Sequence, residues 1–269
     1  MASTTDPLRV AVLGLGEAGG EIARDLVAAG VDVRGYDPLD IDVPGVTRCD
    51  SEAHAATGAA VVLSVNSASA AVAALRAGLP GTSTTATWAD LNTSGGRLKR
   101  ELAGICADAG VAFADVAMMA PVPGKGLRVP MLVCGAGAAA FTDTVRGLGG
   151  DVELLAGPPG SAADRKLVRS VFFKGMTAAV VEALQAARAA GCEEWLRQNI
   201  SDELAKADAA TLDRLEHGTY KHAVRRAAEM RAATDLLTDL GVPARISAAT
   251  AELLTALATT GTPEPHDAR

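Results

Sequence analysis

A glycine-rich turn near the N-terminus constrains the fold of this chain more than any other feature of its sequence. The apolar segment "LRVAVLGLG" (8–16) has the composition of a buried strand, and "AGGEIARDLVAAG" (18–30) follows it with the spacing of an amphipathic helix. Gly14, Gly16 and Gly19 form a Gly-x-Gly-x-x-Gly pattern at the junction. A strand that turns this tightly into a helix opens a right-handed βαβ unit, so the pattern predicts a mostly parallel sheet covered by helices.

The same turn predicts a dinucleotide cofactor. In such a turn the first glycine permits the tight bend, the second lets the backbone approach a pyrophosphate, and the third lets helix and strand pack closely. The helix N-terminus that follows offers N–H groups and a partial positive charge to the phosphates. The expected cofactor-binding residues of the turn are Gly14, Leu15, Gly16, Glu17, Ala18 and Gly19. The alternative is a glycine-rich turn without a ligand, because the pattern by itself is weakly specific.

A carboxylate at the end of the next predicted strand bears on which dinucleotide would bind. The strand "VDVRGYD" (31–37) ends at Asp37, eighteen residues after Gly19. A carboxylate at this place bonds the hydroxyls of the adenosine ribose and repels a 2′-phosphate. We therefore expect NAD as the cofactor, with NADP less favoured. Arg34 precedes Asp37 on the same strand and does not change that preference.

The chain divides into a mixed half and a helical half. Five further strand-like segments follow the first two, at 59–65, 82–91, 111–118, 129–136 and 151–157. The Gly- and Pro-rich stretch "AGPPGSAAD" (156–164) ends this pattern, and only helical patterns come after it. We predict the α/β class, with a Rossmann-type domain of mostly parallel sheet at 1–157 and an all-α domain at 158–269. The helical half would begin with one helix of about thirty residues. Shorter helices are expected near 193–199, 202–215, 220–240 and 244–259.

Composition narrows the class of protein. The net charge of −7 argues against a nucleic-acid partner, which would require a basic surface. The four cysteines and four histidines lack CxxC and HxxxH spacings, so we expect reduced thiols and no metal site. The sequence shows neither a secretory signal nor an uncharged apolar run of the ~18 residues that a membrane span needs. These features favour a soluble cytoplasmic protein with no membrane partner.

The segment "DRKLVRSVFFKGM" (164–176) sets polar residues in a regular row within an apolar helix. Lys166, Ser170 and Lys174 recur every four residues, and each step turns the helix by ~40° beyond a full turn, so the three share one side. The two lysines could extend their stems over apolar neighbours with the charge in water. A lysine could instead act as an acid/base if burial and a nearby cation lower its pKa from ~10.4. Spacing alone leaves both interpretations open.

Six stretches of the sequence together resemble a known family. They are "VLGLGEAGGEIARDL" (12–26), "VVLSVNSASA" (61–70), "ADLNTSGG" (89–96), "DVAMMAPVPGKG" (115–126), "GPPGSAADRKLVRS" (157–170) and "HAVRRAAEM" (222–230). The chain resembles the β-hydroxyacid dehydrogenase and 6-phosphogluconate dehydrogenase superfamily. Within it, the chain is most similar to a divergent phosphogluconate-dehydrogenase-like NAD-binding branch that carries its own small helical C-terminal domain. The likeness extends from Val10 to about Ala258.

The resemblance implies roles for particular residues. Lys166 would be the catalytic acid/base, assisted by Ser170 and Lys174, and Val65 and Asn66 would join the cofactor site. The substrate would contact Asn92, Thr93, Met119, Ala120, Pro121 and His222. Ser170 stands where the family has Asn, and residues 119–121 replace its Ser-Gly-Gly, with Pro121 lacking an N–H group. These departures mean that the substrate cannot be copied from the family.

The expected function is that of an NAD(P)-dependent oxidoreductase acting on a small-molecule substrate. It would interconvert a small hydroxy acid or polyol acid and its carbonyl by hydride transfer, with the lysine as acid/base. Two alternatives stay open: an imine reductase of the same fold, and a catalytically silent NAD-binding sensor. The resemblance further implies a homodimer formed through the C-terminal helical domain.

Overall fold

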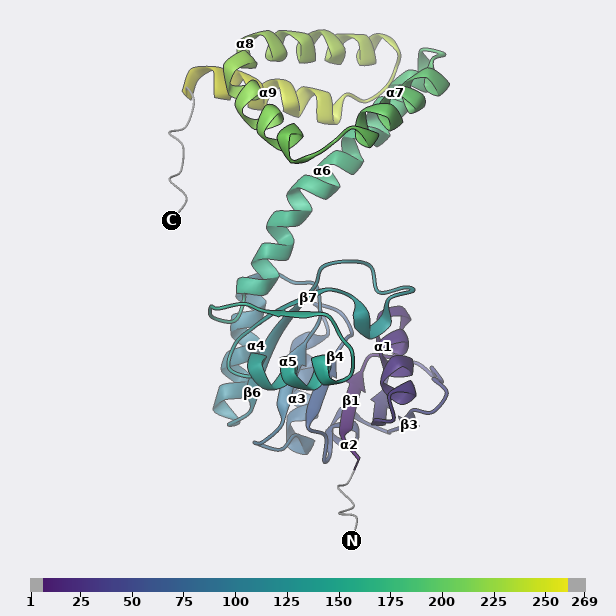
Figure 1. Cartoon of the computed structure of the whole chain (residues 1–269), viewed down its shortest axis with the longest axis vertical. Coiled ribbons are helices and arrows are strands. Elements are labelled where there is room, and N and C mark those ends of the chain that lie inside the picture. The colour runs from purple at the N-terminus through teal and green to yellow at the C-terminus, as the bar shows by residue number, and fades with distance from the viewer. Residues whose placement is uncertain (1–6, 261–269) are drawn as a thin grey trace. The chain divides into compact units, whose positions relative to one another are not determined.

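The computed structural model describes residues 7–260 of the chain (Figure 1). The chain divides into two compact units between Arg169 and Ser170. Helix α6 (Ser161–Ala189) runs through this division, so its first turns belong to the first unit and the remainder to the second. The single long helix expected from the sequence is confirmed. The domain limits expected from the sequence stay a prediction.

Within the described residues, the first unit is built on one eight-stranded sheet. Its strands are β1 (Arg9–Leu13), β2 (Asp32–Tyr36), β3 (Thr47–Arg48), β4 (Val61–Ser64), β5 (Thr87–Asp90), β6 (Ala112–Met118), β7 (Met131–Cys134) and β8 (Val152–Leu154). They lie in the order β3-β2-β1-β4-β5-β6-β7-β8, and every neighbouring pair is parallel except β6 and β7. The predicted Rossmann-type, mostly parallel sheet is therefore confirmed.

Helices cover both faces of this sheet. They are α1 (Glu17–Ala28), α2 (Glu52–Ala56), α3 (Ala71–Gly78), α4 (Gly96–Asp108) and α5 (Ala138–Gly147), and the sequence pattern had not singled out α2, α4 or α5. Side chains alternate along β1, so Val10 and Val12 enter one core cluster while Ala11 and Leu13 enter the other. Burial on both faces explains why the strands of this sheet read as continuous apolar runs.

The second unit is helical, as the sequence predicts. It contains the rest of α6 together with α7 (Glu193–Ala205), α8 (Ala209–Asp239) and α9 (Arg245–Thr260). Two expected helix boundaries are wrong, because α7 continues through residue 200 and α8 continues through residues 216–219. The chain instead leaves α7 at Ala205 and starts α8 at Ala209. Asp208 caps α8, because its side chain accepts a hydrogen bond from the Thr211 N–H at 2.9 Å. Among residues 7–260, no helix is long and apolar enough to cross a membrane.

A buried carboxylate fastens two helices of the second unit. Glu182 of α6 accepts hydrogen bonds from the Ile246 N–H, the Ser247 N–H and the Ser247 hydroxyl, each at 2.7 Å, at the start of α9. Burial by itself would raise the pKa of this carboxyl, but the hydrogen bonds outweigh that effect and lower its pKa. The folded state thus binds the proton of Glu182 more weakly than the unfolded state. Its contribution to stability is full above the unfolded pKa and is lost as pH falls through the lower folded pKa.

We expect Glu182→Gln to lower the stability of the second unit at pH 7 by about 1–2 kcal/mol, because an amide offers one acceptor oxygen instead of two. The difference from the wild type should shrink as pH falls below ~4, the ordinary pKa of the carboxyl in the unfolded chain, and through its lower folded pKa. Thermal unfolding followed by circular dichroism at pH 7 and pH 3 measures both effects. Glu203→Gln on the exposed side of α7 is the matched control. A Glu182→Gln deficit that is equal at both pH values would contradict the stated protonation effect.

Candidate active site

The turn between β1 and α1 is shaped by its glycines. Gly14 has φ +100°, in the region that favours glycine, and its N–H donates to the Tyr36 carbonyl at 2.8 Å. A Cβ on Gly14 would overlap the Val65 carbonyl, and a Cβ on Gly19 would overlap the Gly14 carbonyl. Around Gly16, by contrast, no neighbouring atom lies within 4 Å of the position a Cβ would occupy. The fold therefore requires Gly14 and Gly19, while Gly16 borders open space at the start of α1.

A cavity of about 290 Å³ lies beside this turn, at the ends of β1, β2 and β4. Its lining includes Gly14, Asp37, Glu52 and Asn66, and none of the lining residues is Lys or Arg. Asp37 is 9% exposed, and its two carboxylate oxygens accept hydrogen bonds from the N–H groups of Leu15 (2.8 Å) and Leu39 (2.9 Å). Asp37 thus both lines the cavity and holds the turn between β1 and α1. The acidic lining disfavours an additional phosphate on a ligand bound there.

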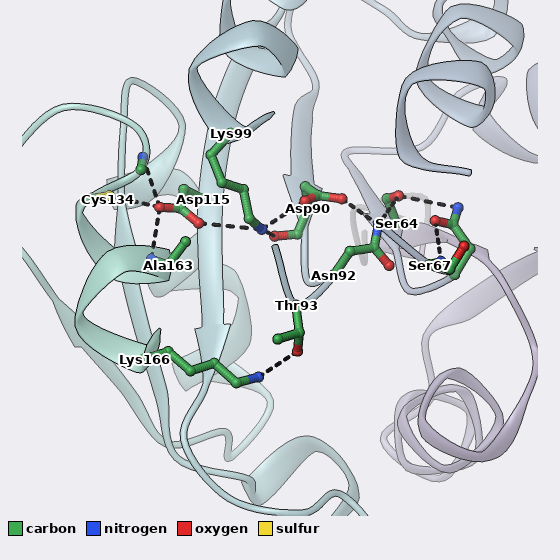
Figure 2. Close-up of polar contacts among 12 residues, drawn as sticks. Ser64, Ser67, Asp90, Asn92, Thr93, Lys99, Asp115, Cys134, Ala163 and Lys166 are labelled. Carbon is green, nitrogen blue, oxygen red and sulfur yellow. Dashed lines mark hydrogen bonds and ion pairs between the residues drawn. The ribbon is translucent and has the colours of Figure 1, made fainter. Parts of the chain in front are cut away.

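Polar side chains connect the carboxyl ends of β4 and β5 (Figure 2). Ser64, the last residue of β4, accepts hydrogen bonds on its hydroxyl from the amides of Asn66 (3.4 Å) and Asn92 (3.1 Å). The same Asn92 amide donates to Asp90 Oδ1 at 2.5 Å. Val65 is buried in this row, and its N–H donates to the Leu13 carbonyl at 2.8 Å. The structure therefore brings predicted cofactor residues (Val65, Asn66) next to a predicted substrate residue (Asn92), at the sheet edge where open α/β folds bind ligands.

The row of polar contacts continues from β5 to β6 through a buried lysine, Lys99. Patterns in the sequence do not single out this residue. Lys99 of α4 donates from Nζ to the Asp90 carbonyl and to Asp90 Oδ2, both at 2.7 Å, and lies 3.3 Å from Asp115 Oδ1. All three side chains have no exposed surface. Asp115 Oδ2 accepts hydrogen bonds from the N–H groups of Gly160 (2.9 Å) and Ala163 (3.2 Å), at the start of α6. The signal available in the sequence was a carboxylate within each of two otherwise apolar strands.

The first turns of α6 carry the lysine that the family resemblance singled out. Lys166 is half-buried, and its Nζ donates a hydrogen bond to the Thr93 hydroxyl at 2.8 Å (Figure 2). Thr93 directly follows Asn92 in the chain, so Lys166 contacts a residue next to this row of hydrogen-bonded polar side chains. An amine within hydrogen-bonding distance of a hydroxyl can take up or supply a proton there. No group of three His, Cys, Asp or Glu side chains within residues 7–260 is placed to hold a metal ion.

The loop after β6 is fastened to α1. The Met119 N–H donates to the Pro130 carbonyl at 2.7 Å, and the Gly124 N–H donates to Glu21 Oε2 of α1 at 3.0 Å. Farther along, the Leu127 N–H donates to Asp25 Oδ2 of α1 at 2.8 Å. Carboxylates of α1 thus set the path of this loop. Substrate contact by Met119, Ala120 and Pro121 stays a prediction.

The remaining predicted site residues belong to the second unit. Ser170 and Lys174 follow Lys166 by one and two turns of α6, and Lys174 is exposed. His222 is exposed and lies at a kink in α8, where its backbone leaves helical geometry (φ −118°, ψ 17°). Their roles in catalysis and substrate binding stay predictions.

Two models of known protein families match separate parts of the chain. Residues 9–142 match the model for the NAD binding domain of 6-phosphogluconate dehydrogenase, and residues 187–257 match a domain of unknown function, DUF1932. A conserved hypothetical protein from Sinorhizobium meliloti 1021 is 30% identical, with 93% of this chain and 88% of that chain covered and a TM-score of 0.60.

Two other solved structures extend the comparison. A conserved protein of unknown function, described as structurally similar to 3-hydroxyacid dehydrogenases, is 26% identical over 93% of this chain and 96% of its own, with a TM-score of 0.61. An imine reductase from Streptomyces aurantiacus is 17% identical over 94% of this chain and 95% of its own, with a TM-score of 0.80, and shows a shared fold. A search of curated protein sequences gave no match.

Proposed function

We propose that this chain, which belongs to the 6-phosphogluconate dehydrogenase-like family of NAD-binding proteins and carries a DUF1932 C-terminal domain, interconverts a small hydroxy acid or polyol acid and its carbonyl. The bound nicotinamide would accept or supply the hydride. Lys166 would act as the acid/base. As a neutral amine it takes the hydroxyl proton during oxidation, and as an ammonium it returns a proton during reduction.

The contact between Lys166 and Thr93 carries this proposal. The 2.8 Å hydrogen bond holds the amine next to a hydroxyl at the carboxyl edge of the sheet. The glycine turn between β1 and α1 lies at the same edge. A substrate hydroxyl that takes the place of the Thr93 oxygen, or that lies beside it, would meet the same amine. Asn92, whose amide nitrogen donates to Ser64 and Asp90, would offer its amide oxygen to a substrate at this edge. These groups suit the removal of a proton from an alcohol.

NAD is the proposed cofactor, with NADP less favoured. The support is the acidic lining of the cavity, where Asp37 and Glu52 would face an adenosine ribose without a compensating cation among the lining residues. A carboxylate hydrogen-bonds the ribose hydroxyls of NAD, whereas it repels the 2′-phosphate of NADP. Because Asp37 also accepts two backbone hydrogen bonds, its replacement must preserve an acceptor oxygen.

We expect Asp37→Asn to reduce the preference for NADH over NADPH by about tenfold or more, because the neutral amide no longer repels the 2′-phosphate. The asparagine retains one oxygen for the backbone N–H groups of the loop. Dissociation constants for the two reduced dinucleotides, measured by nicotinamide fluorescence, give the ratio. Asp40→Asn removes the same charge from a side chain that is fully exposed and is the control. An unchanged ratio in Asp37→Asn would disprove this account of specificity.

Imine reduction is the second candidate, and the structural likeness to imine reductases favours it. Hydride would then reach the carbon of a C=N bond, and the Lys166 ammonium would supply the proton that the product amine needs. The same side chain and the same cofactor serve both reactions. Substrate chemistry alone distinguishes them.

A substrate panel followed by nicotinamide absorbance at 340 nm tests the proposed function. Both cofactors are supplied with hydroxy acids and polyol acids in the oxidative direction, and with cyclic imines in the reductive direction. We expect turnover of a hydroxy acid or polyol acid. Turnover of imines alone would replace this proposal with imine reduction. No turnover from a protein that still binds NADH would favour a catalytically silent NAD-binding sensor.

The proposal includes a homodimer formed through the C-terminal helices. Several large apolar side chains on α6 and α8 face solvent, among them Val171 (76% exposed), Phe172 (54%) and Val224 (72%). Exposed apolar surface of this kind is typical of an interface between protein chains. Light scattering after size exclusion should therefore give twice the chain mass of 27.2 kDa.

A further inference from the structure

Lys99 forms the centre of a buried cluster of charged side chains. One ammonium faces two carboxylates, Asp90 and Asp115, and none of the three side chains has exposed surface. Removing charges from water is costly, and well-packed apolar residues in such places are often as stabilising or more so. The cluster also has an excess negative charge. The partial positive charge at the N-terminus of α6 compensates it, because Asp115 accepts hydrogen bonds from N–H groups there.

This cluster joins the two chain segments whose side chains meet in the candidate site. Asp90 ends β5, and Thr93 follows it by three residues. Asp115 of β6 accepts a hydrogen bond from the Ala163 N–H. Lys166 follows Ala163 by three residues, which is about one helical turn. Lys99 contacts both carboxylates with one ammonium group. It therefore connects the segment that carries Thr93 to the strand that contacts the start of the Lys166 helix.

The same cluster is continuous with the cofactor side of the site. Asp90 Oδ1 accepts from Asn92, and Asn92 and Asn66 both donate to the Ser64 hydroxyl (Figure 2). Asn66 in turn lines the cavity beside the glycine turn. Lys99 thus lies in the middle of an uninterrupted set of polar contacts from the cofactor cavity to the start of α6.

We propose that Lys99 is a positioning residue, which sets the contact between the Lys166 amine and the Thr93 hydroxyl by holding Asp90 and Asp115 together. It acts through these two carboxylates and does not touch substrate. The chemical use of the Lys166 contact rests on the proposed function. The contact itself can be measured without turnover.

The test is NMR of the whole protein after reductive methylation of its lysines with 13C-formaldehyde. The chain has six lysines, so Lys166→Arg assigns the Lys166 signal, and buried Lys99 escapes modification in the folded protein. In Lys99→Met we expect the Lys166 methyl signal to move and its titration midpoint to shift by about half a pH unit or more. Lys206→Met, which removes an exposed lysine directly after α7, should leave both unchanged. An unaltered Lys166 signal and midpoint in folded Lys99→Met would overturn the proposal.

A second variant keeps the test decisive if Lys99→Met does not fold, since it leaves two buried carboxylates without their cation. Asp115→Asn leaves Lys99 and Asp90 as a neutral pair and preserves side-chain shape. It should also move the Lys166 methyl signal, and an unmoved signal would overturn the proposal.

Kinetics separate this inference from the proposed function. With an active substrate, Lys99→Met should lower kcat by about 10²-fold and change the KM for the cofactor by less than about threefold, as expected for a misplaced acid/base. A silent substrate panel would remove the oxidoreductase proposal and leave the NMR result standing. An unmoved Lys166 signal together with turnover would remove the positioning role alone.

Discussion

Lys166→Ala is expected to lower turnover by about 10²–10⁴-fold, the usual contribution of a positioned acid/base, while the protein still folds and binds NADH. Lys166 is half-buried, and its Nζ donates to Thr93, so its removal deletes the proton-transfer group without opening a core. The loss should appear in kcat and kcat/KM together, because the interaction matters most in the transition state. Steady-state rates at 340 nm and NADH titrations measure the two quantities.

Chemical rescue makes the Lys166 test more specific. A small primary amine added to Lys166→Ala should restore part of the lost rate, because it supplies the missing proton-transfer group. Lys206→Ala, at an exposed lysine directly after α7, is the control and should retain wild-type turnover. If Lys166→Ala keeps its rate within a few-fold while the fold is intact, the acid/base role is excluded.

A second pair of variants, Gly16→Ala and Gly19→Ala, should separate cofactor binding from folding. Gly16 has φ −61°, which alanine adopts freely, and no neighbouring atom lies within 4 Å of an added Cβ. Gly16→Ala should therefore melt like the wild type. Its affinity for NADH should fall about tenfold or more, because the methyl group occupies the space through which the backbone approaches a pyrophosphate.

Gly19→Ala should instead lower the stability of the folded protein. Its Cβ would overlap the Gly14 carbonyl, so β1 and α1 must move apart, at a cost of about 1–3 kcal/mol or more. Thermal melting and NADH binding, measured on both variants, give opposite patterns if the turn holds a dinucleotide. Wild-type NADH affinity in Gly16→Ala would show that the cofactor lies elsewhere.

Local patterns in the sequence predicted most of the fold. The apolar strand at 8–16 and the amphipathic helix after it are consecutive, so a local pattern was enough to predict the βα turn. The boundaries of α7 and α8 were harder, because the polar stretch between residues 200 and 219 is compatible with both helix and loop. The Asp208 capping interaction decides where α8 begins, and a cap is recognised only when its partner N–H is known.

In the candidate site, too, residues of one local segment could be found from the sequence, whereas residues that come together from distant segments could not. The glycine turn and Asp37 could be found from spacing, because one βαβ unit supplies them. Lys166 required the family resemblance, because helical periodicity does not separate a catalytic lysine from a solvated one. Asp90, Lys99 and Asp115 lie on β5, α4 and β6, and no local pattern relates them.

The sequence by itself determined the mostly parallel sheet, the helical second half and the glycine turn, since hydrophobic period and glycine placement act over a few neighbouring residues. Only the tertiary structure decided that Lys166 meets Thr93 and that one buried ammonium joins the ends of β5 and β6. The physical reason is the parallel sheet itself. It brings the carboxyl ends of strands that are distant in the chain to one edge, where burial makes each charge depend on its partners.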